Sequence, residues 1–238
     1  MKKLILATFA LTAAASVFAQ GTIVLNNRFT TGNPQTTHIY APLGPSDMVK
    51  IVGLGAGDTP AGGTTDFGGR ALIGANGTAG QYGAAGTFAQ FIAAVGANVP
   101  VESLQPVGQT TTFRTGGGAG FLSQITATLF APGFGDTGGE NDPVLGPFTF
   151  SIVAWDNSSG LYPTWAEARP AWLAGGIAAG MMNPFTVNSL AKGTIPPGQP
   201  TQAGQVLTSF NLYFIPEPGS FALLGLGAAA LLIFRRRK

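Results

Sequence analysis

The stretch that decides the fold is FTFSIVAW, residues 148–155 of a chain of 238 residues. Its side chains alternate, so that Phe148, Phe150 and Ile152 fall on one face and Ala154 continues the same face. In a β-strand, successive side chains point to opposite faces of the sheet. The stretch therefore predicts a strand that is buried on one face.

Similar short runs lie on both sides of this stretch, separated by turns rich in glycine, proline and threonine. Residues 87–94 are apolar enough to form a strand or a helix, and Gly86 and Gly96 near their ends favour a strand. In residues 121–130, apolar and polar side chains alternate as in a half-buried strand. Eight or more short strands with turns between them predict an all-β fold, an antiparallel β-sandwich with Gly-rich loops. The further strands expected are residues 22–27, 48–53, 110–114, 185–187 and 206–214.

One short helix is expected after the central strand. Thr164 and Glu167 are spaced as in a capping box, in which two side chains satisfy backbone N–H groups at the start of a helix. Pro170 lacks a backbone N–H, so it either kinks this helix or restarts it. The sequence thus predicts one β domain, residues 20–215, with a single helical turn or short helix inside it.

The basic residues are divided unequally along the chain. Half of the 12 lysines and arginines lie in the two terminal segments, and the body between them keeps 6 against 9 acidic residues. A body with a formal charge of −3 and scattered cations lacks the basic patch that binds nucleic acid. The chain has no cysteine, which excludes disulfides, thiol nucleophiles, thiolate metal sites and iron–sulfur clusters.

Residues 1–19 have the three parts of a secretory signal peptide. Lys2 and Lys3 form a positive start, residues 4–15 form an apolar segment too short to span a bilayer, and small residues precede the cleavage site. We expect export through the Sec translocon and cleavage by signal peptidase between Ala19 and Gln20. An uncleaved N-terminal anchor is the alternative.

The last residues, 216–238, form a second set of signals. Pro216, Glu217 and Pro218 form an extended tripeptide, because two prolines fix φ and remove two backbone donors. Residues 219–234 are apolar or small and predict a transmembrane helix about 24 Å long, against a hydrocarbon core of about 30 Å. A basic cluster then closes the chain and stays cytoplasmic by the positive-inside rule, with the body outside: Arg235, Arg236, Arg237 and Lys238.

This tail resembles that of the PEP-CTERM proteins of Gram-negative bacteria in the order of its three elements: the Pro-Glu-Pro motif, the apolar segment and the basic cluster. The resemblance implies recognition by exosortase, a membrane protease-transpeptidase, and removal of the tail near the motif. It also implies an exported protein, anchored transiently in the inner membrane and then released to the envelope, the outer surface or the extracellular matrix. Many members are associated with biofilm or extracellular polysaccharide. A plain C-terminal membrane anchor is the alternative.

Aromatic residues follow the central strand closely in the sequence. Trp155, Tyr162 and Trp165 are candidates for stacking on the sugar rings of a glycan, because flat aromatic faces combine an apolar body with a polar edge. Packing into the domain core is the alternative use of such side chains.

An acidic, glycine-rich loop offers the oxygen ligands that Ca²⁺ prefers. Its candidate ligands are Asp136, Glu140 and Asp142. Their spacing does not match the EF-hand pattern, so a solvated turn between strands is the alternative.

The sequence contains no evident catalytic constellation. His38 is its one histidine, and it lies in a polar stretch that is expected at the surface or in a turn. Residues 114–120 are rich in glycine but lack the lysine of a P-loop and precede a strand, so they predict a hairpin turn. We therefore expect a non-enzymatic protein without a cofactor. A carbohydrate-binding module and a polysaccharide hydrolase or lyase are the alternatives.

Overall fold

The computed structural model describes residues 21–30, 34–129, 144–191 and 207–216. They form mostly β-structure with one short α-helix, α2 (Trp165–Leu173), and two 3-10 turns (Val101–Ser103 and Gly116–Gly118), which confirms the predicted all-β class. The strands are β1 (Thr22–Leu25), β2 (Arg28–Phe29), β3 (Gln35–Thr36), β4 (Ile39–Tyr40), β5 (Val52–Gly53), β6 (Thr87–Val95), β7 (Gln105–Thr111), β8 (Ile125–Thr128), β9 (Val144–Asp156), β10 (Ala179–Met181), β11 (Phe185–Leu190) and β12 (Ser209–Asn211).

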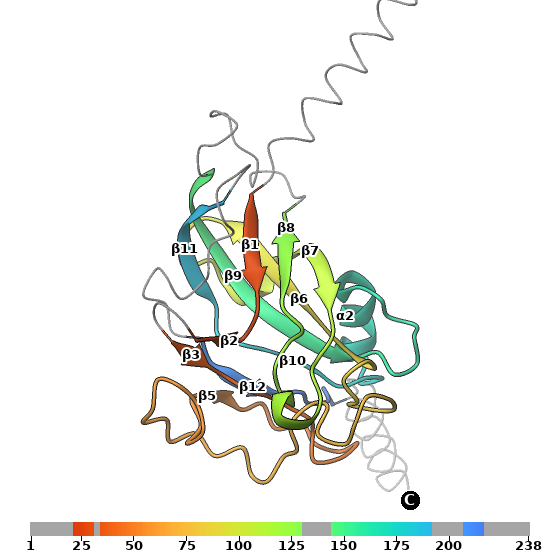
Figure 1. Ribbon diagram of the computed structural model, residues 1–238. Coiled ribbons are helices and arrows are strands. Elements are labelled where there is room, and N and C mark those ends of the chain that lie inside the picture. The colour runs from red at the N-terminus through yellow and green to blue at the C-terminus, as the bar shows by residue number, and fades with distance from the viewer. Residues whose placement is uncertain (1–20, 31–33, 130–143, 192–206, 217–238) are drawn as a thin grey trace, which may run out of the picture.

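The main sheet is antiparallel and is built around β9 (Figure 1). Strand β6 pairs with β9 along its whole length, from Thr87 opposite Asp156 to Val95 opposite Phe148. Strand β7 extends the sheet beyond β6, whereas β10 and β11 pair with two successive parts of the other edge of β9. Smaller sheets join β1 to β8, β2 to β3, and β4 and β5 to either side of β12.

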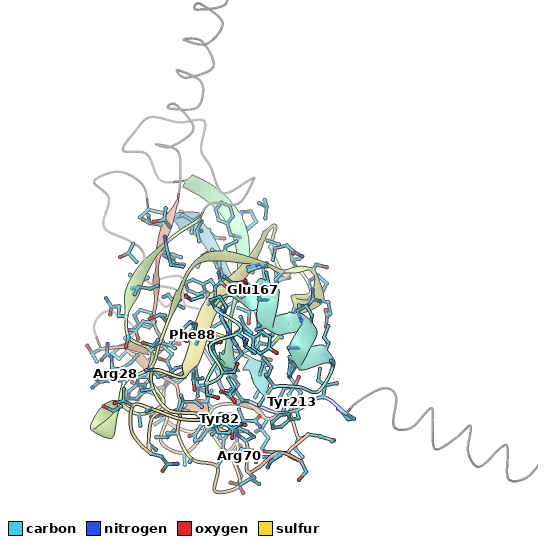
Figure 2. All side chains as sticks on the ribbon, turned by 90° about the vertical axis from the view of Figure 1, so that its right-hand side faces the viewer. Arg28, Arg70, Tyr82, Phe88, Glu167 and Tyr213 are labelled. Atoms are coloured by element: carbon cyan, nitrogen blue, oxygen red, sulfur yellow. The ribbon has the colours of Figure 1, made fainter. Side chains whose placement is uncertain are left out.

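The central stretch 148–155 forms a strand as predicted, but both of its faces are buried. Phe150 and Ile152 face the larger core cluster, whereas Val153 and Trp155 face a second cluster. The two views agree that β1 and β8 lie on one side of the main sheet and α2 on the other (Figures 1 and 2). The expectation of a half-buried strand is therefore wrong for β9, because α2 covers Val153 and Trp155 on the face that alternation leaves for water.

The polar side chains on the second face of β9 have partners in the backbone. Thr149 donates its hydroxyl to the carbonyl oxygen of Gly96 at 2.7 Å, and Ser151 donates to that of Met182 at 2.8 Å. A buried hydroxyl that bonds to a carbonyl avoids the cost of an unpaired polar group. The polar positions of the alternating pattern are thus compatible with a strand that is covered on both faces.

The segment before β5 is less regular than the sequence predicts. The N–H groups of Val49 and Ile51 go to side-chain oxygens of Asp47 and Asn211, at 3.2 and 2.7 Å, instead of to a neighbouring strand. Of the predicted strand 48–53, only its last two residues therefore pair as β5.

Helix α2 starts where the capping pattern predicts and continues further than expected. The carboxylate of Glu167 accepts hydrogen bonds from the backbone N–H of Thr164 at 3.0 Å and from its hydroxyl at 2.8 Å. The backbone donor at the start of the helix is thereby paired. The helix then runs through Pro170 to Leu173. The predicted hairpin at the glycine run is confirmed, since Phe113 and Leu122 form an antiparallel bridge on either side of it.

Strand β10 touches β12 at a glycine. A Cβ on Gly180 would overlap the backbone carbonyl oxygen of Asn211, so β10 can lie against β12 only without a side chain at this position. We expect Gly180→Ala to lower the free energy of unfolding by about 1–3 kcal/mol, because one of the two strands must shift. Urea unfolding followed by tryptophan fluorescence measures this loss.

The matched control for this substitution is Gly117→Ala, in the exposed turn before Phe121. A Cβ there would meet no atom within 4 Å. We expect a change within about 0.5 kcal/mol, as for ordinary surface positions. Equal stability of the two variants would contradict the close contact between β10 and β12.

Candidate functional site

The structure describes only some of the predicted site residues. Pro216 is its last described residue and is exposed. Within the described ranges, no helix is both long enough and apolar enough to cross a bilayer. Among the same residues, no three acidic or histidine side chains lie close enough together to share a metal ion. The predicted sites outside the described residues are Ala19, Gln20, Asp136, Glu140, Asp142, Glu217, Pro218 and Arg235–Lys238.

Two of the three predicted glycan-stacking residues are core residues. Trp155 is 0% exposed and Trp165 is 2% exposed, so neither offers a free ring face to a sugar. Their ring centroids lie 5.8 Å apart, and the indole N–H of Trp155 donates to the carbonyl oxygen of Tyr162 at 2.8 Å. Because α2 closes over these rings, the two tryptophans pack the core, and the stacking prediction is corrected for them. Tyr162 is half-buried.

A pocket of about 230 Å³ opens where this aromatic series reaches the surface. Its wall includes Trp165, Trp172 and Tyr213, with ring centroids 5.6 Å apart for the first pair and 5.4 Å for the second. Apolar walls with a few charged groups around them are the usual composition of a small-molecule site. The charged residues of its lining, all exposed, are Lys50, Glu102 and Arg169.

Tyr213 also lies three residues before the last described residue of the domain, Pro216 (Figure 2). Its backbone exchanges two hydrogen bonds with Ala179 of β10, at 3.0 and 3.2 Å, and its carbonyl oxygen also accepts the indole N–H of Trp172 at 3.0 Å. The next residue, Phe214, donates its N–H to the carbonyl oxygen of Asp47 at 2.8 Å. We call residues 213–216 the tail root. Its first two residues are held by three different segments of the domain.

The loop 42–51 is fastened beside the tail root by side-chain bonds. Asn211, two residues before Tyr213, donates its amide to the carbonyl oxygen of Val49 at 2.9 Å and accepts the N–H of Ile51 at 2.7 Å. These two bonds add to one backbone bond between the same segments, from the N–H of Asn211 to the carbonyl oxygen of Ile51 at 3.2 Å. The loop and the tail root therefore form one surface.

A buried ion pair stabilises the same loop. Arg70 donates from Nε and Nη2 to the two carboxylate oxygens of Asp47, at 2.8 and 2.7 Å, and both side chains are 4% exposed. Burial alone would raise the pKa of Asp47. The hydrogen bonds from Arg70 and from the backbone N–H groups of Leu43 and Val49 outweigh it and hold the pKa below its usual range.

This ion pair predicts a loss of stability in acid. A carboxyl whose pKa is lower in the folded than in the unfolded chain stabilises the fold above its unfolded pKa, about 3.9. That contribution is lost as the pH falls through the lower, folded pKa. We expect Asp47→Asn to lower the free energy of unfolding at pH 7 by about 3–5 kcal/mol, because Arg70 is left buried without its partner.

Thermal unfolding between pH 7 and pH 2 measures both effects. The Asp47→Asn variant should lose less stability across this range than the wild type, because the titrating group is gone. The control is Asp66→Asn, since Asp66 is an exposed aspartate that accepts only a local backbone N–H, that of Gly68. If the two variants behaved alike, Asp47 would not be the stabilising carboxylate.

A second polar cluster joins three distant segments. His38 Nδ1 lies 2.7 Å from one carboxylate oxygen of Asp58, and the other accepts the hydroxyl of Ser209 at 2.7 Å. The backbone N–H of His38 in turn donates to this hydroxyl at 2.6 Å. His38 is therefore neither fully exposed nor in a free turn, and its side chain is 16% exposed. The nearby Tyr40 has its pKa raised to about 12 by burial and, secondarily, by the charge of Asp58.

This cluster has the residue types of a catalytic triad but a different order of bonds. In a triad the serine hydroxyl bonds to the histidine, whereas Ser209 donates to the aspartate and is 0% exposed. The arrangement ties β12 to the segment before β4 and to the loop at Asp58. No signal in the sequence points to it, since the partners of His38 lie 20 and 171 residues away.

The residues that follow Tyr213 match a known sorting motif. A family model of the PEP-CTERM protein-sorting motif matches residues 214–238. No curated protein and no solved structure shows significant similarity to the chain. The motif is that of an exported protein processed at the membrane by an exosortase-type enzyme. It begins at Phe214, the residue whose N–H bonds to Asp47.

Proposed function

Because the chain is a PEP-CTERM sorting domain-containing protein, we propose that it is a non-enzymatic protein of the cell envelope or extracellular matrix. Its body is an antiparallel β-sandwich, and its tail holds it in the inner membrane until the exosortase removes that tail. The observation that carries the proposal is the match of the sorting motif to residues 214–238.

The geometry of the tail root supports this use of the tail. The bonds of Tyr213 and Phe214 fix the chain directly before the motif, and Pro216 is exposed. A processing enzyme needs an extended, accessible segment, and Pro-Glu-Pro cannot join a strand ladder or continue a helix. The exposed Pro216, two residues after the bonded Phe214, meets this need at the start of the motif without unfolding of the domain.

A structural role for the polar cluster supports the non-enzymatic part of the proposal. The serine of the cluster, Ser209, is buried and donates its hydroxyl to Asp58 instead of to the ring of His38. A serine nucleophile needs its hydroxyl free toward the substrate and bonded to a base.

The sorting proposal is tested by mass spectrometry of the protein from its host. We expect the exported wild type to lack the C-terminal peptide that ends in Lys238. Glu217 carries the one charge between Phe214 and Arg235, so Glu217→Gln should leave the tail uncut and the protein in the membrane fraction. The control is Glu102→Gln, at an exposed glutamate of the body, which should be processed as the wild type is. Exported wild type that retains residues 235–238 would contradict the proposal and favour a plain C-terminal membrane anchor.

A second candidate function is the binding of an acidic sugar in the aromatic pocket. The pocket is large enough for about one sugar ring, and the half-buried Tyr213 replaces the buried Trp155 as the candidate for ring contact, whereas Trp172, which also lines the pocket, is only 6% exposed. Lys50 and Arg169 in its lining favour a carboxylate on the sugar, as in a uronate. The extracellular destination makes a polysaccharide a ligand that the protein would meet.

This candidate predicts a difference between acidic and neutral oligosaccharides. We expect an oligouronate, but not a neutral oligosaccharide of equal length, to change the tryptophan fluorescence. The double substitution Lys50→Gln/Arg169→Gln should weaken this binding about tenfold or more, because two charge-assisted contacts are lost. The control is Arg28→Gln, since Arg28 lies outside the pocket, over the ring of Phe121. Fluorescence that no oligosaccharide changes would rule the candidate out.

A further inference from the structure

Large apolar side chains are exposed mainly around the tail root. Six such residues are strongly exposed among those that the structure describes, and four of them come from the loop 42–51 and the end of α2, beside the tail root. The four are Leu43, Met48, Val49 and Leu173, and the two elsewhere are Val95 and Leu161. Single exposed apolar residues need no explanation, but a group at one place marks a contact surface.

Hydrogen bonds and the pocket lining bring the four residues to one face. The loop that carries Leu43, Met48 and Val49 is tied to the tail root through Asp47 and Asn211, as described above. Leu173 lines the aromatic pocket together with Tyr213 and with Lys50, the residue after Val49. We call this surface the root face and define it by Leu43, Met48, Val49, Lys50, Arg169 and Leu173.

The length of chain beyond the tail root limits how far this face can lie from a membrane. Only two residues separate Pro216 from Gly219, where the uncharged segment begins. Three residue steps span at most about 11 Å when fully extended. While the uncharged segment is in the bilayer, the domain surface around Pro216 is therefore held within the headgroup region or directly above it.

The charges of the root face suit an anionic bilayer surface. Lys50 and Arg169 are exposed beside the pocket, against one carboxylate there, Glu102. The nearby Asp47 adds no free charge, because Arg70 neutralises it. Cations next to exposed apolar side chains are the composition of segments that rest in the interface of a bilayer with acidic lipids.

We propose that the root face is a lipid-contacting face, which seats the domain on the acidic lipid surface of the membrane while the tail is inserted. The apolar tips of Met48, Val49 and Leu173 enter the headgroup region, and Lys50 and Arg169 meet lipid phosphates. The inference rests on the proposed function, because it needs the tail in the bilayer. Removal of the tail would then free the root face and open its pocket to solutes.

The absence of cysteine from the chain allows a direct test with single labels. Val49→Cys and Val95→Cys are matched variants, since the two valines are 57% and 53% exposed. Val95 lies at the far end of β6, seven residues from Phe88. Phe88 pairs with Trp155, and Trp155 pairs in turn with Ala179, which lies beside the tail root. Seven strand residues span about 23 Å, so Val95 is well away from the root face.

Each variant, as the full chain, is labelled with an environment-sensitive fluorophore and reconstituted into vesicles of phosphatidylethanolamine and phosphatidylglycerol. We expect the label at position 49 to shift to the blue and to brighten at least twofold, and to be quenched by lipids with nitroxide at the headgroup. The label at position 95 should keep the emission it has in water. Lys50→Gln/Arg169→Gln should at least halve the shift at position 49, and so should vesicles of neutral lipid.

Flotation of the vesicles separates failure of this inference from failure of the proposed function. If the chain does not float with the vesicles, the tail is not inserted, and both proposals are overturned. If it floats but the label at position 49 remains as exposed to water as that at position 95, only the lipid-contacting face is overturned. The same holds if position 49 becomes protected only in membranes that also contain the exosortase, because the face would then belong to a protein partner.

Discussion

The burial of β9 on both faces is the constraint on which the rest of the domain depends. Phe150 on one face and Trp155 on the other are each 0% exposed, so the strand requires a covering layer on both sides. Strands β1, β8 and β12 supply side chains to one cluster, and α2 supplies them to the other. The hydroxyls of Thr149 and Ser151 do not disturb this arrangement, because each finds a carbonyl oxygen.

The position of the tail root follows from the same packing. Helix α2 covers β9 with Trp165 and Trp172, and Trp172 then donates to the carbonyl oxygen of Tyr213. Strand β10, on the edge of β9, pairs with that same residue. The layer that closes the core thus also holds Tyr213, the residue directly before the sorting motif.

Side-chain hydrogen bonds hold the loop beside the tail root. Asp47 and Asn211 hold the loop 42–51 through backbone N–H and carbonyl groups, and Arg70 completes the buried pair with Asp47. A loop held in this way can leave its apolar side chains in solvent, since its own packing does not depend on burying them. The same loop therefore combines a hydrogen-bonded backbone with the exposed apolar tips of Met48 and Val49.

The sequence by itself determined the features that depend on neighbours along the chain: the strand at 148–155, the capping box at Thr164, the hairpin at the glycine run and the C-terminal sorting motif. Only the tertiary structure decided which side chains meet water. It buried Trp155 and Trp165, joined His38 to Asp58 and Ser209, and assembled the aromatic pocket from segments between Lys50 and Tyr213. The physical reason is that local patterns repeat within a few residues, whereas contacts between distant segments leave no periodic trace in the sequence.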